Sequence, residues 1–543
     1  MSPENALSQK QEGMNMKKLV VSRKGSGLVE YGILAGLVSA IAIISVLATG
    51  RSVDESFDQI GAALSENRAG TGVGAGQGGQ SSPPTPPADP YAGYYDPDTF
   101  LIGTEGVDAL DISSGSHPGI MALGGDDTLD GWSPGGIFIG EKGNDRIYTG
   151  GGDDTVVFAA GDGQDYVRTG GGNDVLVFPD LNAADATFVA LNNDDIRITW
   201  ASGDHVEIDE MFWTRAQGFE TVSFLDRDYT YEQVLERVQE ESKATGTVRA
   251  TRQPDAFVHR ASVDPAYTIT GNGDGADSLL FEESNFADVQ IRRPNGDDLI
   301  FTDGQELYLD EYLWQDGWLE TISFADGPRT KDEIWAKSLN DSKSTGLVQG
   351  SRHADDFVHD ADVDGSYTIG GQTGGTDSLT FTKTNFADAR ITRRNPDDIV
   401  VHVQGDEVVV DEYLFQNGWV ENFAFMDGPV DKATIWTRSL NDSKSTGSVD
   451  MSRYADSFSH TNGDGNYTVQ GNKDGADELV FTNQSFASAT ILRDGDTLQI
   501  TTDAGDVVRI YDYFWTAGWL ETITFTDVTP SVNDFQARHD AGG

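Results

Sequence analysis

The spacing of apolar residues divides the chain into two contrasting parts. Residues 28–48 form an apolar run that is long enough to cross a bilayer as a helix. Apolar residues then recur at helical spacing from Val53 to Leu64, which extends the predicted helix over 26–66. Beyond residue 100 the pattern changes to short alternating stretches bounded by turn residues, which predicts strands. The predicted fold class is therefore a single long N-terminal α-helix followed by a mainly β multi-domain array.

A segment of different composition separates the predicted helix from the predicted strands. Residues 70–80 are rich in glycine, and residues 81–90 are rich in proline. Glycine-rich chains are flexible, whereas proline-rich chains are extended and semi-rigid. We therefore expect residues 67–100 to be a linker that holds the β domains away from the helix.

A nine-residue pattern recurs between residues 101 and 180, with glycine at position four, aspartate at six and an apolar residue at eight. Glycine makes the sharp turn that other residues make only at a cost, and the apolar residue starts a short strand. The glycines and aspartates of these turns are Gly106 and Asp108, Gly125 and Asp127, Gly143 and Asp145, Gly152 and Asp154, Gly163 and Asp165, and Gly172 and Asp174.

This pattern resembles the RTX, or haemolysin-type, calcium-binding repeat. The resemblance implies a parallel β-roll at 101–180, in which two nonapeptides make one turn, so that residues separated by two nonapeptides lie above one another. It also implies that the twelve turn residues bind several calcium ions, since calcium prefers carboxylate and carbonyl oxygens. The alternative is that they are Asx–Gly turns of an ordinary β domain.

The spacing of the aspartates favours a stacked roll. Asp127 and Asp145 are separated by the length of two nonapeptides, whereas Asp145 and Asp165 are spaced more widely, which implies a two-residue insertion near 158–160. Gly136 stands where an aspartate is expected, so we expect that turn to lack a carboxylate ligand.

A second, much longer repeat fills the rest of the chain. The sequence Asn-Phe-Ala-Asp at 285–288 recurs at 385–388 and, as Ser-Phe-Ala-Ser, at 485–488. Strand-like alternation followed by a short helix predicts four β units, at 181–246, 247–346, 347–447 and 448–543. Their motifs resemble the domain that often follows haemolysin-type repeats.

The last three β units also carry shortened turns of the calcium type. Their aspartates are Asp277, Asp377 and Asp477, for which a metal site and a plain β-turn fit equally well. Tryptophans recur at fixed positions as well, which suggests either a carbohydrate-binding face or core packing, and core packing is favoured. These tryptophans are Trp314, Trp318, Trp419, Trp515 and Trp519.

Charge and cysteine content narrow the function classes. The formal net charge is −52, with 89 acidic against 37 basic residues, which argues against nucleic acid or an anionic membrane surface as a partner. Such a charge suits a secreted protein in salty, calcium-containing water. The chain has no cysteine, so an extracellular form needs a large core or bound metal in place of disulfides.

The N-terminal segment has a basic leader, a glycine and then the apolar run with one carboxylate near its start. The stretch Lys24-Gly-Ser-Gly-Leu-Val-Glu30-Tyr31 resembles the signal of small Flp-type pilins of tight-adherence systems. The resemblance implies cleavage between Gly25 and Ser26 by a prepilin peptidase, with residues 1–25 as the leader. It also implies that Glu30 and Tyr31 act in assembly, in which Glu30 meets the freed amine of a neighbouring subunit.

No catalytic constellation is recognisable, so we expect a protein that is not an enzyme. The predicted function is a structural subunit of an extracellular Flp-type pilus, with calcium-binding β domains displayed for adhesion or bundling. Its partners would be further copies of itself, the pilus assembly machinery and, before assembly, the inner membrane. The alternative is a calcium-dependent adhesin held singly in the membrane by an uncut helix.

Overall fold

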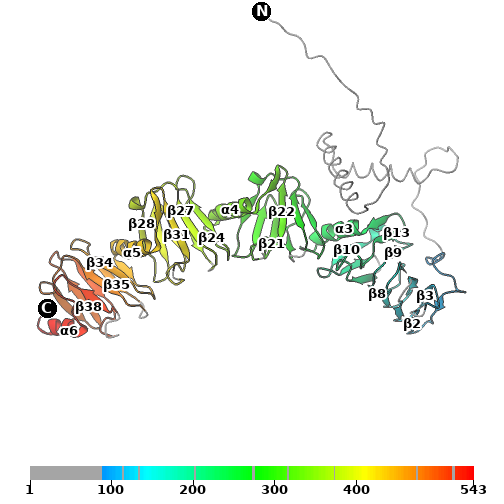
Figure 1. The fold of residues 1–543 in the computed structure, drawn as a ribbon, viewed down its shortest axis with the longest axis horizontal. Coiled ribbons are helices and arrows are strands. Elements are labelled where there is room, and N and C mark those ends of the chain that lie inside the picture. The colour runs from blue at the N-terminus through cyan, green and yellow to red at the C-terminus, as the bar shows by residue number, and fades with distance from the viewer. Residues whose placement is uncertain are drawn as a thin grey trace, which may run out of the picture. The chain divides into compact units, whose positions relative to one another are not determined.

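The computed structural model describes residues 89–542, except for 113–114, 132–134, 201–202, 272–274, 315–316, 372–373, 417, 472–474 and 516–519. These residues form a mainly β structure with parallel sheets (Figure 1). Their four α-helices are α3 (Tyr231–Lys243), α4 (Lys331–Ser342), α5 (Lys432–Ser443) and α6 (Val532–Asp540).

The fold class predicted from the sequence is corrected by this structure. Each α-helix within the described ranges has 9 to 13 residues, and no helix there is long and apolar enough to cross a membrane. The helices are short because each only has to cover the edge of a sheet, and each starts at a capping residue: Thr230, Thr330, Asp431 or Ser531. The predicted helix 26–66 and most of the predicted linker 67–100 lie outside the described residues.

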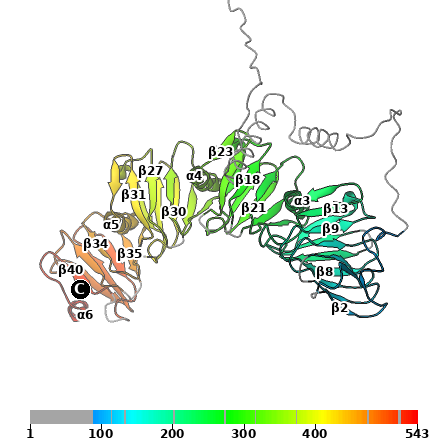
Figure 2. The same cartoon turned by 45° about the vertical axis from the view of Figure 1, so that its right-hand side comes forward.

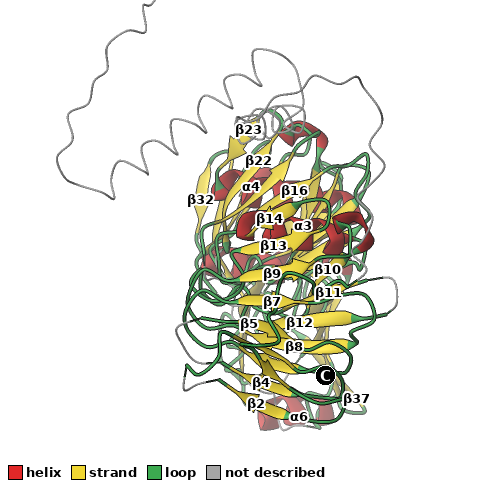
Figure 3. Cartoon of the chain, turned by 90° about the vertical axis from the view of Figure 1, so that its right-hand side faces the viewer, coloured by secondary structure: helices red, strands yellow, loops and turns green. Residues whose placement is uncertain are grey.

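The first part of the structure is a β-roll, in which successive strands alternate between two parallel sheets. Figure 3 shows strands β5, β7 and β9 of one sheet and β4, β8 and β12 of the other lying one above another. The first sheet contains, in order, β1 (Leu101–Ile102), β3 (Gly119–Met121), β5 (Ile137–Ile139), β7 (Thr155–Val157), β9 (Val175–Phe178), β13 (Thr221–Phe224) and β14 (Asp228–Thr230). The second contains β10 (Thr187–Ala190), β11 (Ile196–Thr199), β12 (His205–Asp209), β8 (Gln164–Arg168), β6 (Arg146–Tyr148), β4 (Thr128–Asp130) and β2 (Ala109–Asp111).

The register of the roll confirms the stacking predicted from the spacing. Leu129 pairs with Ile147, which occupies the same position two nonapeptides later, and Ile147 pairs with Val167 across the predicted insertion. Val156 likewise pairs with Leu176. These eighth-position side chains are fully buried between the two sheets, because the alternation of a strand turns every second side chain inward.

Residues 181–246 continue the roll. Strand β12 extends the second sheet in parallel beside β8, and β13 extends the first beside β9. One hydrophobic core therefore runs from Ile112 to Val238, and α3 covers its end.

Each of the three tandem units that follow is a shortened roll with an added antiparallel hairpin. Figure 2 labels strands from both sheets of the first unit, β18 and β21, and of the second, β27, β30 and β31. In the first unit, one sheet contains, in order, β15 (Thr247–Arg249), β17 (Tyr267–Thr270), β21 (Glu306–Asp310), β20 (Leu299–Thr302) and β19 (Gln290–Arg292). The other sheet contains β16 (Ala256–His259), β18 (Asp277–Phe281), β22 (Leu319–Phe324) and β23 (Gly327–Arg329). In the second unit, one sheet contains β24 (Leu347–Gln349), β26 (Tyr367–Gly370), β30 (Asp406–Val410), β29 (Ile399–Val403) and β28 (Arg390–Arg393). The other contains β25 (Asp356–His359), β27 (Asp377–Phe381), β31 (Val420–Phe425) and β32 (Gly428–Val430). In the third unit, one sheet contains β33 (Ser448–Asp450), β35 (Tyr467–Gln470), β39 (Val507–Ile510), β38 (Thr497–Thr501) and β37 (Thr490–Asp494). The other contains β34 (Ser457–His460), β36 (Glu478–Phe481) and β40 (Thr522–Thr524).

Each tandem unit has its own hydrophobic core between its two sheets. Helix α4 packs against β19 of its own unit and against β24 of the next, and α5 packs in the same way against β28 and β33. The helices therefore join neighbouring units, and the segments that follow them belong to these junctions.

Candidate metal centres in the turn ladders

The turns along one edge of the roll are linked by a ladder of carboxylates, which we call the first column. Each aspartate accepts a hydrogen bond from the backbone N–H of the aspartate one turn earlier. The N–H to Oδ1 distances are 2.7 Å from Asp108 to Asp127, 2.8 Å from Asp127 to Asp145 and 2.9 Å from Asp145 to Asp165.

A second column runs along the opposite edge. The N–H of Gly136 donates to Asp154 Oδ1 at 2.7 Å, and the N–H of Asp154 donates to Asp174 Oδ1 at 2.9 Å. The N–H of Asp174 then donates to Glu220 Oε2 at 2.6 Å. Gly136 thus occupies the aspartate position that its spacing predicted and contributes no carboxylate.

The second oxygen of each inner carboxylate has no protein partner. Among the described residues, Oδ2 is buried without a hydrogen bond in Asp127, Asp145, Asp154, Asp165 and Asp174. All five side chains are at most 2% exposed. Buried charged groups are normally paired or bound to a metal, because an unpaired charge loses its hydration without compensation. These oxygens are therefore suited to a bound cation.

The electrostatics of the columns point to the same need. Burial raises the pKa of Asp145 to about 7, that of Asp165 to about 8 and that of Asp174 to about 7, and neighbouring acidic groups add to each shift. Burial also raises the pKa of Asp127 and Asp154. Stacked carboxylates repel one another until a proton or a cation neutralises them.

The glycines bring backbone carbonyls close to the carboxylates. A Cβ atom on Gly143 would lie 1.7 Å from the carbonyl oxygen of Gly125, and one on Gly163 would lie 1.9 Å from that of Gly143. A Cβ on Gly172 would lie 1.9 Å from the carbonyl oxygen of Gly152. The turns therefore stack backbone on backbone and form a cradle of hard oxygen atoms of the kind that calcium prefers.

Asp108 differs from the other predicted ligands. Its Oδ2 accepts hydrogen bonds from the N–H and the hydroxyl of Thr104, at 2.6 and 2.8 Å, and Gly106 in the same turn is exposed. Oδ2 of Asp108 is thus hydrogen-bonded within its own turn. In the first column, a buried Oδ2 that is left for a cation occurs only from Asp127 onward.

The described residues contain no group of three or more His, Cys, Asp or Glu side chains that could hold a metal by themselves. An ion between two turns would therefore need carbonyl oxygens as well as carboxylates. The residues present fit a calcium ion on those terms, and they lack the nitrogen and sulfur ligands that zinc prefers.

The weaker candidates Asp277, Asp377 and Asp477 occupy the same ladder position in the tandem units. Each accepts a backbone hydrogen bond from the preceding turn at 2.9 Å. The sequence reasoning missed the residues that close these ladders, which are Glu220, Glu320, Glu421 and Glu521. The available signal was the glutamate that ends the recurring Gly-Trp-Leu/Val-Glu motif of the last three units and the Gly-Phe-Glu sequence at 218–220.

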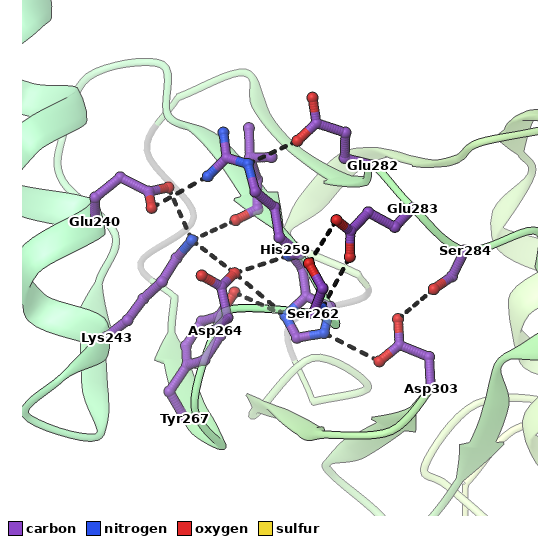
Figure 4. Close-up of polar contacts among 12 residues, drawn as sticks. Glu240, Lys243, His259, Ser262, Asp264, Tyr267, Glu282, Glu283, Ser284 and Asp303 are labelled. Atoms are coloured by element: carbon purple, nitrogen blue, oxygen red, sulfur yellow. Dashed lines mark hydrogen bonds and ion pairs between the residues drawn. The ribbon is translucent and has the colours of Figure 1, made fainter. Parts of the chain in front are cut away.

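A buried polar cluster joins α3 to the first tandem unit (Figure 4). Lys243 Nζ lies 2.9 Å from Asp264 Oδ2 and 2.8 Å from Glu240 Oε1. His259 is fully buried beside it, with Nε2 3.1 Å from Asp303 Oδ1. The lysine contact recurs at the next two junctions, as Lys343–Asp364 at 2.6 Å and Lys444–Asp464 at 2.5 Å. At each of these junctions a lysine ammonium group, rather than a bound metal ion, therefore pairs with an aspartate of the following unit.

The recurring tryptophans fall into two groups. Trp318 and Trp419 are buried, which confirms the core prediction for them. Trp314 and Trp515 are 46% and 74% exposed, so the core prediction was wrong there. The guanidinium of Arg352 from the next unit lies 4.1 Å from the ring centre of Trp314. Trp519, like the predicted processing and assembly residues Gly25, Ser26, Glu30 and Tyr31, lies outside the described residues.

Comparison with known proteins does not assign the chain to a family. No protein-family model matches it, and no curated protein matches it. A match among solved structures is the crystal structure of the extracellular lipase LipA from Serratia marcescens, with 12% identity over 58% of this chain and 37% of the lipase. The chain thus covers little more than a third of that enzyme. The TM-score is 0.11, so we draw no conclusion about fold or activity from this match.

Proposed function

We propose that this protein is an extracellular calcium-binding β-roll protein with a structural and adhesive role rather than a catalytic one. The observation that carries the proposal is the set of five buried carboxylate oxygens without a partner, arranged in two columns beside backbone carbonyls. The strongly acidic composition suits a secreted protein in salty, calcium-containing water, and without cysteine such a protein would need a large core or bound metal in place of disulfides.

Calcium has a specific physical task in this proposal. Each ion neutralises adjacent buried carboxylates that otherwise repel one another, so ion binding and folding of the roll are linked. We expect residues 101–180 to be largely unfolded in chelator and to gain β structure at millimolar calcium. Far-UV circular dichroism of the full chain during calcium titration tests this, and a spectrum that is insensitive to calcium would refute it.

We further propose that the protein is displayed as a subunit of a Flp-type pilus. The support is the sequence at 24–31, with Gly25, Ser26, Glu30 and Tyr31 at the positions that the pilin resemblance requires. The second candidate is an adhesin anchored singly in the membrane, which the same apolar run at 28–48 would support.

Mass spectrometry of filaments sheared from native cells separates the two candidates. A peptide that starts at Ser26 in polymeric material supports the pilus subunit. A chain that keeps residues 1–25 and occurs only in membranes supports the anchored adhesin. The calcium proposal is independent of this result, because the turn columns lie in a different part of the chain.

A further inference from the structure

Each tandem unit contains a short ladder of three carboxylates. The first rungs are Asp255, Asp355 and Asp456, the second rungs are Asp277, Asp377 and Asp477, and the third rungs are Glu320, Glu421 and Glu521. The third rung accepts the N–H of the second at 2.5, 2.8 and 2.7 Å in the three units. The same three-rung arrangement therefore occurs three times.

The first rung is already neutralised or satisfied by the protein. In every unit its Oδ2 accepts the N–H of the serine or threonine four residues earlier, at 2.5 to 2.6 Å. Its carboxylate also meets a side chain from the preceding unit, which is Gln239 at Asp255, Arg293 at Asp355 and Arg393 at Asp456. The first rung thus needs no ion from solution.

In the first and third tandem units the second rung lacks such a partner. Within the part of the chain that the structure describes, Oδ2 of Asp277 and Oδ2 of Asp477 are buried without a hydrogen bond. Both side chains are 1% exposed. Burial also raises the pKa of Asp277 to about 6, and that of Asp377 and Asp477 to about 7, with the adjacent glutamate adding to each shift.

A β-bulge places the glutamate against the second rung. In the first tandem unit Asp277 pairs with Leu319, but Ser278 pairs with Thr321, so Glu320 is the extra residue. The second unit has the same shift at Glu421, between the pairs Asp377–Val420 and Ser378–Asn422. A bulge re-aims one side chain out of the regular pattern, and here the longer side chain spans the added distance to the ladder.

Backbone carbonyls of the first-rung turn lie close to the glycines of the second-rung turn in each tandem unit. A Cβ on Gly475 would lie 2.4 Å from the carbonyl oxygen of Tyr454, and one on Gly374 would lie 2.2 Å from that of Arg352. A Cβ on Gly275 would lie 3.0 Å from the carbonyl oxygen of Gln253. The turns of the tandem units thus reproduce the stacked carbonyls of the roll.

We propose that each tandem unit binds one calcium ion between its second-rung aspartate and its third-rung glutamate, with turn carbonyls completing the shell. This inference rests on the proposed function of the roll, because it assigns the same ion to the same kind of turn. It differs in its ligands, since a glutamate replaces the aspartate of the next nonapeptide. The three sites are Asp277–Glu320, Asp377–Glu421 and Asp477–Glu521.

Calcium content per full-length chain tests the proposal. The chain and its Glu320→Gln/Glu421→Gln/Glu521→Gln variant are incubated with calcium chloride and then desalted to remove unbound calcium. The calcium that stays bound is measured by elemental mass spectrometry. Glutamine can still accept the backbone hydrogen bond but carries no charge, so we expect the variant to lose three ions per chain. The control is Glu306→Gln/Glu407→Gln, at two glutamates that are 58% and 60% exposed, and it should keep the wild-type content.

The outcomes separate this inference from the proposed function. A wild-type chain without bound calcium overturns both. A wild-type chain that binds calcium and a triple variant that binds the same number overturn the inference alone. If the triple variant does not fold, each single variant is measured, and each must lose one ion. A folded single variant with the wild-type calcium content overturns the assignment.

Discussion

Arg393 and Asp456 form a bidentate ion pair across the junction between two tandem units. Arg393 Nη1 donates to Asp456 Oδ2 at 2.8 Å and Nη2 donates to Oδ1 at 2.6 Å, and both side chains are fully buried. Arg293 and Asp355 make the equivalent contact one junction earlier, at 2.7 Å. Although burial opposes it, the pKa of Asp456 is lowered by the hydrogen bonds and the charge of Arg393. The first rung of each ladder is therefore part of the joint between units.

Removing this arginine should destabilise the junction strongly. Arg393→Met leaves the carboxylate of Asp456 buried without its counter-charge, which costs about 3–5 kcal/mol. We expect an earlier urea transition in tryptophan fluorescence, because Trp436 donates to Asp456 and reports on the same site. The matched control is Arg493→Met, since Arg493 is 36% exposed and pairs with Asp496 on the surface, and it should cost less than about 1 kcal/mol. Recovery in the double variant Arg393→Met/Asp456→Asn would support the ion pair as the cause, and an unchanged transition in the single variant would contradict it.

A methyl group at the stacked glycines should prevent formation of the roll. In Gly143→Ala the new Cβ would overlap the carbonyl oxygen of Gly125, at 1.7 Å, and the residue has a φ of +153°. We expect a loss of about 4 kcal/mol or more and no β signal on adding calcium. Gly161→Ala serves as the control, because it also has a positive φ, of +98°, but meets nothing within 4 Å. It should cost only about 1–2 kcal/mol. Equal effects of the two substitutions on the circular dichroism transition would argue against close stacking of the turns.

The metal-free roll should become less stable as pH rises. Burial raises the folded-state pKa of Asp145 to about 7 and that of Asp165 to about 8, from an ordinary value of 3.8. Between these values the folded state binds more protons than the unfolded state, so the free energy of unfolding falls with increasing pH. In chelator we therefore expect the β signal of the roll to be strongest near pH 4 and to be lost as pH rises toward about 8, so that the metal-free roll is largely unfolded at neutral pH.

Calcium should weaken this dependence. Protons and calcium compete for the same carboxylates, so the stabilisation that calcium adds to the roll should shrink as pH falls below about 7. Far-UV circular dichroism in chelator and in excess calcium, compared over the same pH series, checks both trends. Parallel pH profiles in the two conditions would show that the buried aspartates do not bind the ion.

Neutralising one inner carboxylate should weaken calcium binding while the hydrogen bond of the ladder is kept. In Asp145→Asn the amide oxygen can still accept the N–H of Asp127, while the buried negative charge is lost. We expect affinity to fall about tenfold or more, because a contact with a charged group contributes about 1.5 kcal/mol or more. Isothermal titration with calcium chloride measures the change. The exposed Asp98→Asn is the control and should bind as the wild type does. A wild-type affinity for Asp145→Asn would remove Asp145 from the ligands.

The sequence by itself determined the repeating parts of this structure. The spacing of the turn aspartates set the register of the roll, because strands that stack turn on turn pair at the length of one turn. The apolar eighth positions identified the core, and Gly136 was found at the aspartate position that its spacing predicted. These features depend on residues within one turn of each other, which is the range over which a local pattern is informative.

Only the tertiary structure decided how distant segments complete each ladder. Glu320 reaches Asp277 from 43 residues away through a bulge, and the short motif that ends in Glu320 does not show which carboxylate it meets. The contact between Arg393 and Asp456 joins two units, so whether it forms depends on how their sheets pack. Trp314 is exposed where Trp318, four residues later, is buried, although both occur among apolar neighbours. In each case the deciding factor is how whole sheets pack, within one unit or between two units, rather than local spacing.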